Sequence, residues 1–304
     1  MDPSLAREVA EARDTCLAPE GLAALELDFA HALAPPADTC VALRIDGATA
    51  GIVTADRVER LLQFKTVFRR EGDALTLVCE LDTEERRSAA ITAVTRSLAA
   101  EGALTAWRNE LYAARPSFAA PAWFHLERAA ARYFGIHTYA AHANGLVATT
   151  RGTAMWIARR SPAKAIDPGM LDNLVGGGIA AGMGILDTLV KEAWEEAGVP
   201  PVLARAARAT GSLSILREVP DGIQRETIYV HDLWLPAGFT PANQDGEACE
   251  HRCLDLRAIA SLLAESSAPR AMTVDASLVA LDCLVREGVL PPLQTLSARL
   301  APRS

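Results

Sequence analysis

Three glutamates, Glu192, Glu195 and Glu196, are spaced so that they share one face of a helix. At about 100° per residue, positions i, i+3 and i+4 lie side by side, and like charges at these spacings repel each other. A hard divalent cation such as Mg²⁺ would remove this repulsion, because it prefers oxygen ligands and is commonly shared with substrate phosphates. A solvated charged face is the alternative, and the neighbouring residues decide between the two.

The segment around the glutamates contains the elements that a cation site needs. A run of glycines, Gly176 to Gly178, precedes them, and glycine lets the backbone approach a ligand closely. The spacing predicts a helix over residues 186–197, and Gly198 is a natural helix terminator. Because the glycines, the helix and its end are in register with the glutamates, the sequence favours the cation site.

This register resembles the Nudix box, G-x5-E-x7-R-E-U-x-E-E-x-G-U, in which U is a bulky aliphatic residue. The spacing fits without an insertion, and the matching positions are Gly177, Lys191, Glu192, Ala193, Glu195, Glu196, Gly198 and Val199. The resemblance implies that the three glutamates are catalytic and hold Mg²⁺ or Mn²⁺. In the family the metal bridges a diphosphate while water attacks phosphorus.

Three positions depart from the motif. The family's glutamate after the glycine loop is Met183, its arginine is Lys191 and its aliphatic residue is Ala193. The family's glutamate and arginine can form a supporting ion pair, and both members are changed here. Since the three glutamates of the helix are intact, the sequence predicts an active variant with lower metal affinity or fewer bound ions.

Other segments resemble one branch of the family, related to the Nudix part of fungal thiamine pyrophosphokinases and to plant Nudix enzymes of the same layout. Members of this branch carry an extra N-terminal domain. The matching segments are residues 107–112 and 127–129, near the end of that domain, and residues 142–145, 156–161, 168–178 and 243–247. The resemblance implies hydrolysis of a diphosphate bond, with oxidised forms of thiamine diphosphate among the substrates.

Four residues outside the box are candidates for the catalytic and phosphate-binding positions. Glu247 follows a turn-like segment in a region where Nudix enzymes often place an extra carboxylate as a ligand or base, and Glu250 competes with it. Arg159 and Arg160 end a predicted strand, and a guanidinium suits phosphate because it donates two hydrogen bonds. Adjacent strand residues face opposite sides, so at most one of these arginines is expected at the site.

Further substrate contacts are expected around the glycine run and from an aromatic residue. Asp172 precedes the run and could orient it, while Gly177 and Gly178 would let the backbone approach the substrate. The ring of Trp107 could stack on a pyrimidine or thiazolium ring, although tryptophan more often packs in a core or an interface. The same two interpretations stay open for Trp123 and Trp156.

The order of elements predicts the fold class. Helices are expected over residues 83–101, 124–134, 254–264 and 276–287, and Asn144-Gly145 predicts a hairpin turn. Strands and helices mix without regular alternation, which indicates a mixed-sheet α/β or α+β protein. We expect a smaller accessory α/β domain in residues 1–135. A Nudix α/β/α sandwich with an added C-terminal helix should follow in residues 136–304.

Composition limits the partners. A net charge of −8 argues against non-specific nucleic-acid binding, and a membrane span is not expected because no long enough apolar run was found. The first residues lack a secretory signal, so a cytoplasmic location is expected. A small-molecule diphosphate is the expected partner, and we expect a homodimer.

The sequence therefore predicts a Mg²⁺- or Mn²⁺-dependent pyrophosphohydrolase that acts on an organic diphosphate such as thiamine diphosphate or an oxidised analogue. One alternative keeps the chemistry but makes the substrate a nucleoside diphosphate derivative or an oxidised nucleotide. Another is a non-catalytic ligand sensor of the same fold. Met183 motivates that alternative, and the intact glutamates oppose it.

Overall fold

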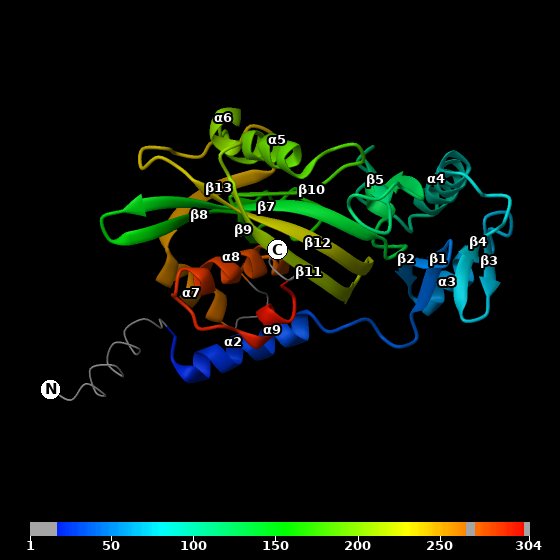
Figure 1. Cartoon of the computed structure of the whole chain (residues 1–304), viewed down its shortest axis with the longest axis horizontal. Helices are drawn as coiled ribbons and strands as arrows, with labels where there is room; N and C mark the ends of the chain where they lie inside the picture. Colours follow the sequence, from blue (N-terminus) through cyan, green and yellow to red (C-terminus); the bar gives the residue numbers. More distant parts are fainter. Residues whose placement is uncertain (1–16, 266–270, 301–304) are drawn as a thin grey trace.

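The computed structural model describes residues 17–265 and 271–300, and its largest part is a seven-stranded mixed sheet (Figure 1). The central strand β7 (His137–Thr149) runs parallel to β12 (Gly222–Trp234), which pairs in turn with β11 (Arg208–Val219). On its other side, β7 pairs through residues 140–143 with β10 (Val175–Gly178) and through residues 145–149 with β8 (Gly152–Arg160). Strands β9 (Leu171–Asn173) and β13 (Ala248–Asp255) pair with β8.

Helices cover both faces of this sheet (Figure 1). One face carries α5 (Ile185–Ala197) and the short α6 (Pro201–Ala204). The other carries α7 (Leu256–Ala264), α8 (Val274–Arg286), α9 (Gln294–Ser297) and α2 (Pro19–Ala32). This three-layer arrangement with a mixed sheet confirms the predicted fold class. Within the described residues, no helix is both long and apolar enough to cross a bilayer.

A second, smaller sheet lies at the other end of the molecule (Figure 1). Its strands have the order β2-β1-β4-β3. They are β1 (Val41–Ile45), β2 (Ala48–Val53), β3 (Phe68–Glu71) and β4 (Ala74–Leu77). Helices α3 (Ala55–Leu61) and α4 (Glu84–Ala100) contribute to its separate apolar core. Thr83 caps α4 by accepting a hydrogen bond from the Arg86 amide at 3.3 Å.

Two segments connect the small core to the large one. The hairpin of β5 (Leu111–Ala114) and β6 (Phe124–Glu127) leads into a single 3-10 turn, Arg128–Ala130, directly before β7. At the start of the chain, α2 packs through Leu25 and Phe29 into the core of the large sheet. Residues of the expected accessory domain thus contribute to both cores, and the division of the chain at residue 135 stays a prediction.

Two local predictions were wrong, and one strand was missed. Residues 124–134 are not a helix, since Phe124 and Leu126 alternate into the small core from β6. Asn144-Gly145 is not a turn, because both residues lie inside β7. A Cβ on Gly145 would lie 2.2 Å from Leu174, so this glycine serves close packing instead of chain reversal. Strand β13 occupies residues before α7 and was missed because its exposed residues do not alternate in polarity.

Candidate active site

The site forms where helix α5 meets the glycine strand β10, and each glycine has a neighbour that requires it. A Cβ on Gly176 would lie 2.8 Å from Cε1 of His142, and the Gly176 amide donates to Glu196 Oε2 at 2.9 Å. A Cβ on Gly177 would lie 2.4 Å from Cδ of Glu192, and one on Gly178 would lie 1.8 Å from the Tyr112 hydroxyl. Glycine therefore lets the carboxylate helix approach the strand, and it lets Tyr112 approach from the hairpin that precedes the large sheet.

The three predicted carboxylates do lie together on α5, with one lysine among them. Lys191 Nζ donates to Glu192 Oε1 at 2.9 Å and to Glu195 Oε2 at 2.7 Å. Burial raises the pKa of Glu192, although Lys191 acts against the shift. Burial also raises the pKa of Glu196 well above its usual value, and the charge of Glu192 adds to that shift. Two carboxylates are thus held in a place that disfavours their charge unless a cation is near.

The chemistry of this donor set fits a hard divalent cation, because all three side chains offer carboxylate oxygens beside a backbone without Cβ atoms. The side chains are not yet gathered around one point. Within the described part of the chain, no group of three or more histidine, cysteine, aspartate or glutamate side chains is arranged to hold a metal ion. Lys191 accounts for part of this, since it holds Glu192 and Glu195.

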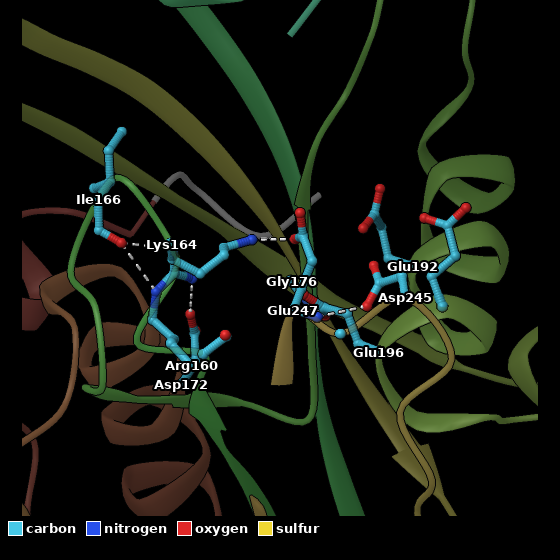
Figure 2. A network of polar contacts seen from close by, with 12 residues as sticks. Arg160, Lys164, Ile166, Asp172, Gly176, Glu192, Glu196, Asp245 and Glu247 are labelled. Carbon is cyan, nitrogen blue, oxygen red and sulfur yellow. Dashed lines mark hydrogen bonds and ion pairs between the residues drawn. The ribbon is translucent and has the colours of Figure 1, made fainter. Parts of the chain in front are cut away.

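Glu247 is brought to the site by a loop fixed on the end of α5. The loop amides of Ala242 and Gln244 donate to the carbonyls of Ala197 and Glu195, at 3.0 and 2.7 Å. The Glu247 carboxylate then bonds to Lys164 Nζ (Figure 2) and lies 3.7 Å from Arg108 Nη1. Burial would raise the pKa of Glu247, but the hydrogen bond and charge of Lys164 outweigh it, so this pKa lies below its usual value.

The two strand-end arginines have different partners. Arg160 forms an ion pair with Asp172 at 2.6 Å and donates to the carbonyl of Ile166 (Figure 2). Both members of this pair line a recess of about 130 Å³ beside Gly176, Gly177 and Gly178. Arg159 instead pairs with Glu250 at 2.9 Å and donates to the carbonyl of Gly169. Of the two arginines, only Arg160 borders the glycine strand.

The predicted aromatic contact lies elsewhere. The Trp107 ring is 39% exposed, its nitrogen donates to Asn109 Oδ1 at 2.8 Å, and it lines neither the recess nor the larger cavity next to it. Trp123 packs on the core of the small sheet and Trp156 on the core under α5. None of these three tryptophans contributes to the walls described here.

Three residues of the site were not found from the sequence. Lys164 contacts Glu247, Tyr112 touches the glycine strand, and Arg128 borders the recess close enough to Glu192 to influence its pKa. Lys164 is one of only three lysines in the chain, and the structure shows that Lys164 and Lys191 both bind candidate site carboxylates, which the sequence alone does not indicate. The Glu127-Arg-Ala129 segment resembles the branch, but this resemblance implies no role for the arginine.

Comparison with known proteins assigns the two parts of the chain to two families. Residues 138–275 match the NUDIX domain, and residues 30–138 match a domain of unknown function, DUF4743. Two Arabidopsis thaliana proteins are each 40% identical to the chain. They are Nudix hydrolase 24, chloroplastic, over 225 residues (74% of this chain and 61% of that protein) and Nudix hydrolase 20, chloroplastic, over 218 residues (72% and 58%). The uncharacterized protein YJR142W of Saccharomyces cerevisiae is 30% identical over 246 residues, 75% of this chain and 70% of that protein.

These relatives correct one prediction and establish another. The expected cytoplasmic location is wrong on this comparison, since both plant relatives are chloroplastic proteins. The chain spans about three fifths of the length of each of them. The domain match, together with the box on α5 and β10, supports the predicted family: residues 138–275 are a NUDIX domain, and the chain is similar to Nudix hydrolases.

Proposed function

We propose that this chain is a Mg²⁺- or Mn²⁺-dependent pyrophosphohydrolase that cleaves the diphosphate bond of a small organic molecule. The observation that carries the proposal is the contact between α5 and β10. It places Glu192 and Glu196 against a backbone from which Gly176 donates an amide hydrogen bond and Gly177 projects no side chain. This arrangement leaves backbone accessible beside carboxylates that need a cation.

In this proposal Glu192, Glu195 and Glu196 hold the metal, with Glu247 as a further ligand or the base. When bound, the cation would neutralise the diphosphate and polarise its phosphoryl oxygens. Glu196 also fixes the position of β10 through the Gly176 amide. Gly177 and Gly178 would expose their backbone to the substrate. Asp172 holds Arg160 at the recess, where the guanidinium can donate to phosphate oxygens.

Lys164 has a positioning role that follows from its contacts. Its ammonium group holds the Glu247 carboxylate in its charged form, and its side chain is only 12% exposed. A diphosphate bound beside β10 would lie near the guanidinium of Arg128, which borders the recess, and near Lys164, whose charge acts on Glu196. In this proposal the side-chain cations contact the diphosphate, and the carboxylates of α5 bind the metal ion.

A hydrolysis assay on purified protein tests the proposal. Thiamine diphosphate and an oxidised analogue are the first substrates, and ADP-ribose and an oxidised nucleoside diphosphate represent the nucleotide alternative. We expect monophosphate products with Mg²⁺ or Mn²⁺ and none in EDTA, with activity restored when metal is added back. Full activity in the chelator, or no hydrolysis of any substrate with either metal, would contradict the proposal.

Two further proposals accompany this function. We propose an accessory unit that ends near residue 135 and a homodimeric assembly, which light scattering would test directly. Binding to nucleic acid is not proposed, because the net charge of −8 disfavours a phosphate backbone.

A further inference from the structure

A cavity of about 440 Å³ lies between the two parts of the molecule. Its walls come from the segment that precedes the large sheet, including Tyr112, Arg128 and Arg132, and from the β11–β12 hairpin, including Gln224 and Glu226. It shares five lining residues with the recess at the glycine strand, which are Arg128, Arg132, Ile166, Asp167 and Glu226. The two spaces therefore adjoin, and together they lead from the carboxylate helix to the accessory part.

The accessory part forms a wall of this space through direct contacts with the site. Tyr112 fills the place of the missing Gly178 side chain, and the Arg128 guanidinium lies 5.7 Å from the Tyr112 ring centre. Arg128 is held by Glu110 at 2.8 Å, and its side chain stays 44% exposed because it borders the cavity. A molecule with its diphosphate at β10 would thus have its remaining part between the accessory segment and β12.

Some charges in this wall form ion pairs, and the carboxylate of Glu226 forms none with the described residues. Arg128 pairs with Glu110, and Arg132 pairs with Asp221 at 3.3 Å. Glu226 accepts only from neutral groups, the Thr138 hydroxyl and the Gln224 side-chain amide, each at 3.0 Å. No cation in the described residues forms an ion pair with it. Glu226 borders both the cavity and the recess, so its carboxylate has acceptor capacity left for a ligand.

From this geometry we infer that the cavity binds the organic group of the substrate and that Glu226 selects a nitrogen heterocycle with N–H donors or a positive charge. The inference rests on the proposed function and adds the part of the substrate that the Nudix box does not contact. The volume is in the range of small-molecule sites, about 300–1,000 Å³. A carboxylate that borders a cavity and accepts only from neutral groups favours a ligand that supplies a cationic or N–H donor.

Binding of reaction products tests the inference without catalysis. Calorimetry would give dissociation constants for thiamine monophosphate, AMP and inorganic phosphate with the full chain and with Glu226→Gln. We expect one heterocyclic monophosphate to bind more tightly than phosphate. Its affinity should fall about 10- to 100-fold in Glu226→Gln, as for a lost charged hydrogen bond, while phosphate affinity stays within about twofold. The matched control is Glu218→Gln, an exposed glutamate of the same hairpin, which should change nothing.

A second variant tests the space in the cavity independently of the Glu226 charge. Thr105 lines the cavity from the accessory side and is exposed, so Thr105→Trp should fold normally while it reduces the space for the ring. This variant should bind the heterocyclic monophosphate more weakly and bind inorganic phosphate with unchanged affinity. Equal losses for both ligands, or a wild-type chain that binds neither monophosphate better than phosphate, would overturn the inference. Hydrolysis with metal in the separate assay would then still support the proposed function, so the two failures are distinguishable.

Discussion

Two charged groups face each other across the candidate site, and their composition is opposite. On helix α5 one cation is shared by two carboxylates, since Lys191 binds both Glu192 and Glu195. The second group, which we call the loop side, consists of Glu247, Lys164 and Arg108. Here one carboxylate is shared by two cations, since Glu247 contacts both Lys164 and Arg108. Helix α5 is left with excess negative charge, to which Glu196 adds, and the loop side with excess positive charge.

The difference indicates which partner each side is suited to bind. Excess carboxylate charge near a backbone without side chains favours a divalent cation. Excess positive charge nearby favours the phosphates that this cation would accompany. The two groups should therefore respond differently to mutation, with metal affinity governed by α5 and anion affinity by the loop. The predictions below test this separation.

The largest effect is expected from Glu196→Gln. The amide keeps an oxygen that can accept from Gly176 but loses the charge, so turnover with Mg²⁺ should fall about 100-fold or more. Its melting temperature without metal should stay equal or rise, because one repelling charge is removed. Steady-state kinetics and thermal unfolding measure both, with the exposed Glu218→Gln as the control. A large drop in melting temperature would mean that Glu196 is mainly a structural partner.

Lys164→Met tests the loop side. Without this lysine Glu247 loses its hydrogen-bonded cation, and the excess positive charge at the loop disappears. We expect KM for the diphosphate to rise about 10-fold, as for a charged contact, with a smaller change in Mn²⁺ affinity because the three glutamates of α5 are intact. Lys65→Met is the control, because Lys65 is the exposed third lysine. A change in Mn²⁺ affinity with constant KM would reverse the assignment of the two sides.

Lys191→Met tests the helix side and should act in the opposite direction. Lys191 is 46% exposed and holds two carboxylates, so its removal should tighten Mn²⁺ binding by a modest factor, about 3- to 10-fold. Without metal the variant should melt at a lower temperature, since the glutamates then repel each other, and Mn²⁺ should restore it. Paramagnetic resonance of free Mn²⁺ gives the affinity. Unchanged or weaker binding would show that Lys191 supports the metal site instead of competing for it.

The comparison also shows which part of the site the sequence could predict. The helix side follows from local spacing: three glutamates within five residues fix their shared face, and Gly198 ends α5 in the left-handed conformation as expected. The loop side depends on contacts between distant residues, such as Lys164 with Glu247, 83 positions apart. No local period encodes such a pair, so Glu247 was predicted only by its region and Lys164 was missed.

Tertiary packing explains the wrong local predictions in the same way. Asn144-Gly145 has the composition of a turn, yet Asn144 is buried and donates to Asp232 at 3.1 Å while Gly145 accommodates Leu174. The fold class was predictable because it depends on the sum of many elements. Single turns and strand edges were less predictable, because one buried neighbour can override their propensity.

The smallest expected effect is that of pH on the stability of the fold. This effect must be known before variants of the two charged groups are compared at different pH values. Burial, with a smaller contribution from Arg225, lowers the pKa of His137 to about 4, from 6.5. As pH falls below 6.5, the unfolded chain gains a proton that the folded chain refuses, so stability is lost between about pH 6.5 and 4. At pH 5 His137 should lower the free energy of unfolding by about 1–2 kcal/mol after allowance for its partial exposure. This corresponds to a decrease of a few degrees in melting temperature. His137→Gln can keep the contact with the Thr227 hydroxyl and should flatten this pH dependence, whereas the exposed His31→Gln should not. If His137→Gln and the unmodified chain lose the same stability from pH 7.5 to pH 5, the acid sensitivity comes from other groups, such as His231 and His251, whose pKa values burial also lowers.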